Sequence, residues 1–562
     1  MDASQNLGPM ETEFETDPSR YRHWQVTYDG DIATVIMRVQ PDGGLREGYE
    51  LKLNSYDLGV DIELADVVRR MRFEHPEVRC VVVTSGTDNV FCAGANIHML
   101  GSSTHAWKVN FCKFTNETRC EIEDAEAFSN QVYVAACNGT TAGGGYELAL
   151  ACKEIYLIDD GNSAVSLPEV PLLGVLPGTG GLTRLVDKRK VRRDRADVFS
   201  TTAEGIRGKK AVKWNLVDGV FPRSKFDKKI RARAEALAGE FKDGLAAGER
   251  KGVTLGPLSP SKEPGKRVYK HVSLEWDDAT RIATLTVAGP SAEDVAVVEG
   301  GAEAIFAAGD QLWALRAMRE LDDALLYLRV NLIDVGLVLV RTTGDAARTL
   351  AHDKALWAAR EHWFANEVLR HMARALRRMD LTSRSFFALG EAGTAFAGCL
   401  LELALASDRF YLLDDPDNVV QVGVGPLNAA LPMSHGCTRL DAHLYGEPDK
   451  LEAVIGALAE GTLYEPEEAD DAGLVTVLLD DIDWEDDVRV AIEERVSQSP
   501  DALTGMEANL RFPGAENATS KIYARLTAWQ NWIFIRPNAT GPTGALTLYG
   551  RPERPRFNWG RV

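Results

Sequence analysis

The sequence predicts an α/β fold that occurs twice in the chain. Residues 80–84 and 132–136 are apolar runs with the composition of buried strands, and each is followed by a glycine-containing turn and a helical segment. Repeated strand–turn–helix units are typical of layered α/β domains. Several segments of the first half recur in the second half in the same order, which we interpret as a duplication.

Three matches support the duplication. The first match lies at the start of each copy, the second joins a helical segment to a strand, and the third, a shared Leu-Val, is weaker. The matching segments are 21–35 with 269–285, 147–160 with 402–415, and 215–217 with 473–475. Their shared order and comparable spacing make chance similarity a poor explanation.

The repeat sets the expected domain boundaries. A polar N-terminal tail at 1–20 precedes a catalytic copy at 21–245, a linker rich in Gly, Pro, Ser and Lys at 246–267, and a second copy at 268–562. Near the C-terminus, apolar residues recur at helical spacing and predict one face of a helix for packing or oligomerisation, namely Ile522, Leu526, Trp529 and Ile533.

Composition excludes several classes of protein. The 562 residues include 83 acidic and 63 basic side chains, and the net charge of −20 disfavours nucleic acid or an anionic membrane as a partner. No apolar run reaches eighteen residues and the N-terminus has no apolar leader, so we expect neither a membrane span nor a secretory signal. Eight cysteines without a Cys-x-x-Cys pair disfavour disulfides and zinc, so we expect a cytoplasmic protein with no metal.

Three short segments of the first copy combine glycines with acidic residues. They are the small-residue loop at 91–96, the glycine triad at 143–145 that opens a helix carrying Glu147, and the loop around Glu169 that continues to 181. A glycine run at a helix start lets backbone N–H groups approach a ligand, and the helix dipole favours negative charge there. A second N–H from the loop at 91–96 would complete a two-donor oxyanion hole, and Glu147 and Glu169 could face one another as a carboxylate pair.

At these residues the chain resembles the crotonase (enoyl-CoA hydratase/isomerase) superfamily over about 24–220. The resemblance implies a ββα superhelix that binds an acyl-CoA, with Ala95 and Gly144 as the oxyanion-hole donors and Glu147 and Glu169 as the catalytic acids. It also implies a pocket for CoA and substrate, lined by Lys52, Asn54, Cys92, Ala93, Gly94, Gly143 and Gly145. Coenzyme A would be part of the substrate, with no separate cofactor.

The second copy departs from this pattern. Glu402 matches Glu147, but the glycine triad is replaced by Gly398, Cys399 and Leu400, and Val424 stands where Glu169 would be. Without N–H donors and a partner acid, we expect the second copy to be a degenerate scaffold.

Three further segments, at 185–194, 520–532 and 556–559, resemble a narrow group of the superfamily, the ring-opening dihydrolases of 2,3-epoxybenzoyl-CoA. This resemblance implies ring opening with water and C–C cleavage to formate and 3,4-dehydroadipyl-CoA semialdehyde, in aerobic benzoate degradation. It also suggests a homo-oligomer, with a dimer favoured.

Two alternatives stay open at this point. One is an enoyl-CoA hydratase or isomerase acting on another acyl-CoA, and the other is a non-catalytic acyl-CoA-binding scaffold. The group that activates the second water is also open: Cys112 is a candidate, although a helix-buried structural cysteine explains it at least as well.

Overall fold

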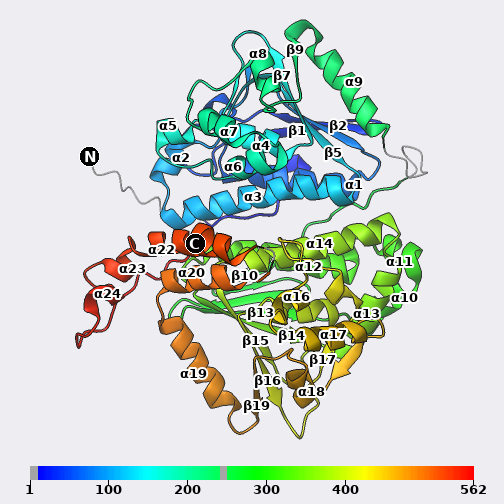
Figure 1. Cartoon of the computed structure of the whole chain (residues 1–562). Helices are drawn as coiled ribbons and strands as arrows, with labels where there is room; N and C mark the ends of the chain where they lie inside the picture. The colour runs from blue at the N-terminus through cyan, green and yellow to red at the C-terminus, as the bar shows by residue number, and fades with distance from the viewer. Residues whose placement is uncertain (1–10, 241–249, 515) are drawn as a thin grey trace. The chain divides into compact units, whose positions relative to one another are not determined.

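The computed structural model describes residues 11–240, 250–514 and 516–562. Its contacts divide the chain into two compact units, Met1–Leu255 and Gly256–Val562 (Figure 1). No helix in the described part of the chain is long and apolar enough to cross a membrane.

The first unit is built on a six-stranded sheet with one antiparallel edge. The first two strands pair antiparallel and all later pairs are parallel. In spatial order the strands are β1 (Trp24–Asp29), β2 (Ile32–Met37), β3 (Cys80–Ser85), β5 (Val132–Cys137), β7 (Glu154–Asp159) and β9 (Gly219–Pro222). Strands β3 and β5 contain the two apolar runs from which the fold was predicted, and both are buried because parallel strands are covered on both faces.

A second, three-stranded parallel sheet turns this arrangement into a spiral. Its strands are β4 (Asn89–Cys92), β6 (Gly139–Ala142) and β8 (Val165–Ser166). Each follows one strand of the large sheet and precedes a helical segment: α2 (Ile97–Ser102) with α3 (His105–Phe128), then α4 (Gly144–Ala151), then α5 (Glu169–Leu173). This is a ββα superhelix, so the fold predicted from the sequence is confirmed.

Helices close the two faces of the large sheet. Helix α1 (Leu58–Glu74) packs beside α3, as Figure 1 shows. Helix α9 (Phe226–Ala238) covers the strands through Phe226, Ile230 and Leu237, which join Val82 and Val134 in one buried cluster. The remaining short helices are α6 (Gly181–Thr183), α7 (Arg193–Ser200) and α8 (Gly208–Lys213).

The second unit repeats this topology. Its sheet contains, in order, β10 (Ser261–Glu263), β11 (Lys266–Val268), β12 (Val272–Asp277), β13 (Ile282–Ala288), β14 (Leu337–Thr343), β15 (Ser385–Gly390), β16 (Arg409–Asp414) and β19 (Val477–Asp480). Strands β12 and β13 pair antiparallel, and β13 to β19 are parallel, as in β1 to β9. The repeated sequences at 32–35 and 282–285 therefore fall on equivalent strands, and the duplication is confirmed.

The helices of the second unit are more numerous, and its small sheet is reduced. Helices α12 (Trp313–Asn331) and α14 (Trp363–Leu381) pack together as α1 and α3 do. The others before the C-terminal region are α10 (Ala292–Glu299), α11 (Gly301–Ala308), α13 (Ala346–Ala358), α15 (Leu401–Leu405), α16 (Arg439–His443), α17 (Pro448–Ala457) and α18 (Pro466–Asp471). Only an antiparallel pair, β17 (Val422–Val424) and β18 (Thr462–Tyr464), replaces the three-stranded sheet.

The boundary between the two units, after Leu255, falls within the predicted linker, and parts of the predicted tail and linker also pack against the two copies. Within the predicted tail at 1–20, Phe14 is buried and its ring lies 5.3 Å from that of Phe114, so residues 11–20 pack on the first copy. Within the predicted linker at 246–267, β10 and β11 form a hairpin that extends the second sheet. Gly265, with a φ of 74°, supplies the hairpin turn, and its polar neighbours gave this segment the composition of a linker. Residues 1–10 and 241–249 lie outside the described part.

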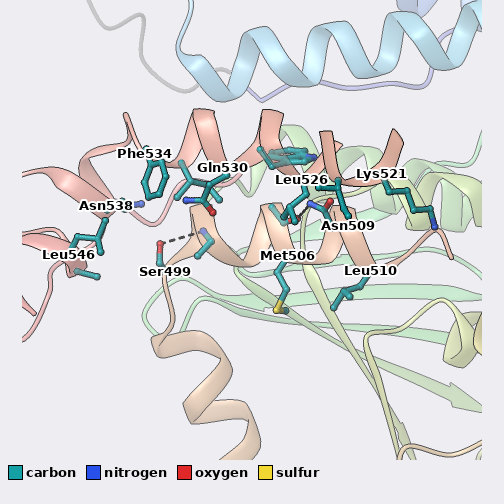
Figure 2. A pocket seen from close by; sticks show the side chains of 17 residues that line it. Ser499, Met506, Asn509, Leu510, Lys521, Leu526, Gln530, Phe534, Asn538 and Leu546 are labelled. Carbon is teal, nitrogen blue, oxygen red and sulfur yellow. Dashed lines mark hydrogen bonds between the residues drawn. The ribbon is translucent and has the colours of Figure 1, made fainter. Parts of the chain in front are cut away.

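The C-terminal region forms an apolar groove of about 700 Å³. Helix α20 (Pro500–Leu510) lies on one side, and a π-helical turn at Lys521–Leu526 followed by α22 (Thr527–Ile533) lies on the other (Figure 2). The predicted stripe Ile522, Leu526, Trp529 and Ile533 lines this groove. The other helices of the region are α19 (Trp484–Ser497), α21 (Ala518–Ser520), α23 (Pro537–Thr540) and α24 (Ala545–Leu548).

Candidate active site

The glycine triad passes through a space that admits no side chain. Gly143 has a φ of 54° and a ψ of −130°, which favours glycine, and a Cβ there would lie 2.8 Å from Oε1 of Glu169. A Cβ on Gly144 would lie 2.0 Å from the hydroxyl of Tyr56, and one on Gly145 would lie 2.6 Å from the Cβ of Cys92. The triad is therefore a steric requirement at all three positions.

The loop after β4 lies directly against this turn. Gly94 has a φ of 89°, and a Cβ on it would lie 2.8 Å from the backbone nitrogen of Gly144. The thiol of Cys92 donates to the carbonyl of Asn54 at 3.0 Å and accepts from the N–H of Gly94 at 3.3 Å. Burial raises the pKa of Cys92 to about 12, so this thiol shapes the loop and is not a nucleophile at neutral pH. Ala93 is exposed beside it.

Two backbone N–H groups are left available at this contact. The loop pairs with the segment before α1: the N–H of Tyr56 donates to the carbonyl of Gly94 at 3.0 Å, and the N–H of Asn96 donates to the carbonyl of Tyr56 at 2.8 Å. The N–H of Ala95 lies between these bonds. Within the described residues, neither it nor the N–H of Gly144 donates a hydrogen bond. Two such donors, one at a helix start, can bind a carbonyl oxygen that gains negative charge.

Glu147 lies in the first turn of α4 and is buried. Its Oε1 accepts hydrogen bonds from the N–H groups of Thr179 at 2.9 Å and Gly181 at 2.8 Å. Its Oε2 accepts a short hydrogen bond from the hydroxyl of Thr179. Three donors therefore hold both oxygens of this carboxyl group in place.

Glu169 begins α5 and is in a different environment. It is partly buried, and its Oε2 has no hydrogen-bond partner among the residues that the structure describes. Burial, and to a smaller extent the charge of Glu147, raise the pKa of Glu169 to about 7. Near neutral pH, Glu169 is therefore protonated in a large fraction of molecules.

Two other predicted residues, Lys52 and Cys112, form no hydrogen bond with the glycine triad within the part of the chain that the structure describes. Lys52 is exposed and forms a 2.7 Å ion pair with Glu50. Cys112 lies on α3, and its Sγ would be 3.3 Å from a Cβ built on Gly178. Burial, followed by the charges of Glu147 and Asp61, raises the pKa of Cys112 to about 11. A thiol that stays protonated at neutral pH is a poor base for activating water.

Asn54 is buried and uses its whole side-chain amide inside the protein. The amide connects the ends of β2 and β3 with β4. It accepts from Val39 N and Thr87 Oγ1 and donates to Met37 O, Ser85 Oγ and Phe91 O, at distances between 2.8 and 3.1 Å. This amide stabilises the loops beneath the glycine triad.

We expect Asn54→Ala to lower the free energy of unfolding by about 2–4 kcal/mol, because several buried groups would lose their partners at once. Denaturant unfolding measures this change. The matched control is Lys52→Ala, which should stay within about 0.5 kcal/mol because that side chain is exposed. An Asn54→Ala protein of normal stability would contradict the structural role of this amide.

The second copy keeps the backbone conformation of the helix start, but its N–H donor is already bound within the protein. Gly398 has a φ of 50°, close to the 54° of Gly143. The N–H of Cys399, equivalent to that of Gly144, donates to Oδ2 of the buried Asp353 at 2.5 Å. A carboxylate of the protein itself therefore occupies the position of a ligand oxygen.

Glu402 also has partners within the protein for both of its carboxyl oxygens. It is buried, its Oε1 accepts from the amide of Asn428 at 2.7 Å, and its Oε2 pairs with Arg439 at 3.0 Å. Arg439 in turn pairs with Asp380 at 2.6 Å. Burial raises the pKa of Glu402 to about 7 although Arg439 and Asn428 lower it, and both oxygens are held in a structural network.

We expect Glu402→Gln to destabilise the fold by about 3–5 kcal/mol, since it leaves part of a buried ion-pair network uncompensated, while turnover per folded molecule stays normal. Glu147→Gln should nearly abolish turnover. Activity and unfolding curves of both variants separate the two outcomes.

Titration with benzoyl-CoA should also give one site per chain, and a stoichiometry of two would contradict a closed second copy.

Three residues of these sites were missed by sequence reasoning. Tyr56 and Asp353 carry no local motif, because their roles depend on contacts distant in sequence. Thr179 lies inside a Gly-Thr-Gly-Gly run. A single polar side chain between glycines is the signal in the sequence that could have pointed to its contact with Glu147.

The fold and this site define an acyl-CoA enzyme of the enoyl-CoA hydratase/isomerase class, whose sequence profile matches residues 50–249. Solved structures with a similar arrangement include an enoyl-CoA hydratase from Bacillus anthracis, 26% identical, with a TM-score of 0.33, covering 39% of this chain and 77% of that one. Another is an enoyl-CoA hydratase from Mycobacterium avium subsp. paratuberculosis K-10, 22% identical, with a TM-score of 0.32, covering 40% of this chain and 77% of that one.

A closer relative matches both halves. The benzoyl-CoA-dihydrodiol lyase of Aromatoleum evansii is 54% identical over 551 residues, which cover 98% of each protein. The chain therefore belongs to the benzoyl-CoA-dihydrodiol lyase family within the crotonase superfamily, and it is an enzyme of the lyase type.

Proposed function

We propose that the chain opens the ring of 2,3-epoxybenzoyl-CoA, whose product of water addition is a dihydrodiol of benzoyl-CoA, in aerobic benzoate degradation. The observation that carries this proposal is the pair of glutamates in unlike environments beside two available N–H groups. The products would be formate and 3,4-dehydroadipyl-CoA semialdehyde. Two molecules of water balance the equation, because the substrate gains four hydrogen and two oxygen atoms in forming these products.

The oxyanion-hole donors would bind the thioester oxygen. Ring opening moves electron density toward the thioester carbonyl, and the N–H groups of Ala95 and Gly144 would stabilise the charge that develops on its oxygen. One such donor contributes about 2.7–4 kcal/mol to lowering a barrier. The acyl-CoA pocket would include Lys52, Ala93 and the glycines that let the backbone approach.

The two acids would divide the proton transfers. Glu147, held by three donors, acts as the carboxylate that activates water. Glu169, with a pKa near 7, acts as the acid that protonates the opening oxygen. Apolar side chains follow Glu169 closely, and Leu172 and Leu176 are 65% and 66% exposed, which suits a mouth for the aromatic ring. Because the Cys112 thiol stays protonated, we assign activation of the second water to the carboxylates as well.

We expect Glu169→Gln to lower turnover about 100-fold or more while benzoyl-CoA affinity stays within a few-fold of wild type. The wild-type rate should also fall as pH rises through about 7, because an acid must be protonated to donate. The alkaline limb of the profile should disappear in the variant. An unchanged limb, or near-normal turnover, would remove Glu169 from this role.

Product analysis tests the reaction itself. Mass spectrometry after incubation with 2,3-epoxybenzoyl-CoA should show formate and a six-carbon CoA semialdehyde, while a simple enoyl-CoA should remain unchanged. Hydration of the enoyl-CoA alone would favour a hydratase or isomerase. Binding of both esters without turnover would favour a non-catalytic acyl-CoA-binding scaffold.

The remaining parts of the proposal concern setting and assembly. We propose a cytoplasmic enzyme that needs no separate cofactor or metal, since the CoA belongs to the substrate. We also propose a homo-oligomer, most simply a dimer, formed through the C-terminal region. Large apolar side chains there are exposed, among them Leu510, Ile535 and Tyr549, and such patches mark interfaces.

A further inference from the structure

We propose that Thr179 is a positioning residue of this reaction, whose hydroxyl and N–H hold the Glu147 carboxylate in its working orientation. The inference rests on the proposed function, and it adds a residue to which no role has been assigned. Thr179 itself is buried, so its contacts are made within the protein.

The contacts of Thr179 fix both oxygens of one carboxyl group. Its N–H donates to Oε1 of Glu147 at 2.9 Å, and its hydroxyl donates to Oε2. The N–H of Gly181 adds a third bond at 2.8 Å. Because two donors from one residue reach the two oxygens separately, they set the plane of the carboxyl group as well as its position.

The loop that carries Thr179 is anchored on α3. The carbonyl of Thr179 accepts from Nη1 of Arg184 at 3.1 Å, and the same guanidinium pairs with both carboxylate oxygens of Glu123 at 2.9 Å. The amide of Asn116 donates to the carbonyl of Gly178 at 3.0 Å. Thr179 therefore connects a rigid helix to the carboxylate of Glu147.

Two glycines after Thr179 allow this loop to approach the Glu147 carboxyl group closely. Gly180 has a φ of 87°, and a Cβ on Gly181 would lie 2.8 Å from Oε1 of Glu147. Only a segment without side chains at both positions can bring the hydroxyl of Thr179 and the two N–H groups onto one carboxylate.

Comparison of the acids supports a specific role. Glu169 receives no equivalent set of donors, and its Oε2 is without a partner among the described residues. Glu402, the counterpart of Glu147 in the second copy, is held by the cation of Arg439 and the amide of Asn428 instead. Glu147 thus receives its hydrogen bonds from a hydroxyl and two N–H groups, and among the described residues no cation pairs with it.

The test compares Thr179→Val with Thr179→Ser, using Thr118→Val as a matched control. Thr118 is also buried in the first copy, but its hydroxyl donates to a backbone carbonyl of its own helix, that of Phe114. Valine keeps the branched shape of threonine and replaces the hydroxyl with a methyl group, so each substitution deletes one buried donor.

We expect Thr179→Val to move the acidic limb of the kcat/KM profile up by about one pH unit and to lower kcat about ten- to a hundred-fold at pH 7, with little change in KM. Thr179→Ser should restore the wild-type limb, and Thr118→Val should leave it in place. A wild-type profile in Thr179→Val, a serine variant as impaired as valine, or an equal shift in Thr118→Val would each overturn the proposal.

A second measurement separates this proposal from the choice of substrate. In the full-length protein labelled with carbon-13 at glutamate carboxyls, the Glu147 signal is assigned by its loss in Glu147→Gln. Its titration midpoint should rise by about one pH unit in Thr179→Val without any substrate present. An unchanged midpoint would overturn the role of Thr179, whereas a shifted midpoint in a protein inactive on 2,3-epoxybenzoyl-CoA would place the failure in the proposed function.

Discussion

The site depends on the close approach of backbone and side chains at the start of α4. Gly143 passes over Glu169, Gly144 over Tyr56 and Gly145 over Cys92, each at a distance that excludes a Cβ. This approach leaves the N–H of Gly144 beside the loop of Ala95 and places Glu147 one turn further along the helix. The buried Asn54 amide fixes the loops below, so the hydrogen bonds of the scaffold define the geometry of the site.

The two glutamates show how the same side chain acquires different chemistry in one pocket. Glu147 accepts three hydrogen bonds, whereas Oε2 of Glu169 has no partner among the described residues and burial raises the pKa of Glu169 to about 7. The difference comes from the segment 169–181 and not from the identity of the acids.

The sequence was sufficient for the general plan. Apolar runs and glycine turns predicted the strands and helix starts of the first copy, and the repeated segments at 32–35 and 282–285 predicted a second sheet of the same topology. Glycine positions predicted close backbone approach because a positive φ is a local property. Thr179, Tyr56 and Asp353 were not predictable in their roles, since each depends on a partner tens of residues away. The hairpin at 261–268 was missed because its charged strands lie at a sheet edge and resemble a linker in composition.

The carboxylate of Asp353 acts on the second copy as a tethered competitor. A group attached to the protein has a high effective concentration, commonly in the millimolar range even for flexible tethers. A thioester oxygen would have to displace it from the N–H of Cys399 and leave a buried charge without its partner. In the second copy the N–H of Cys399 is thus already occupied by an internal carboxylate, in addition to the loss of the catalytic residues. A substitution of Val424 by glutamate would therefore not make the second copy catalytic while the Asp353 carboxylate still binds the N–H of Cys399.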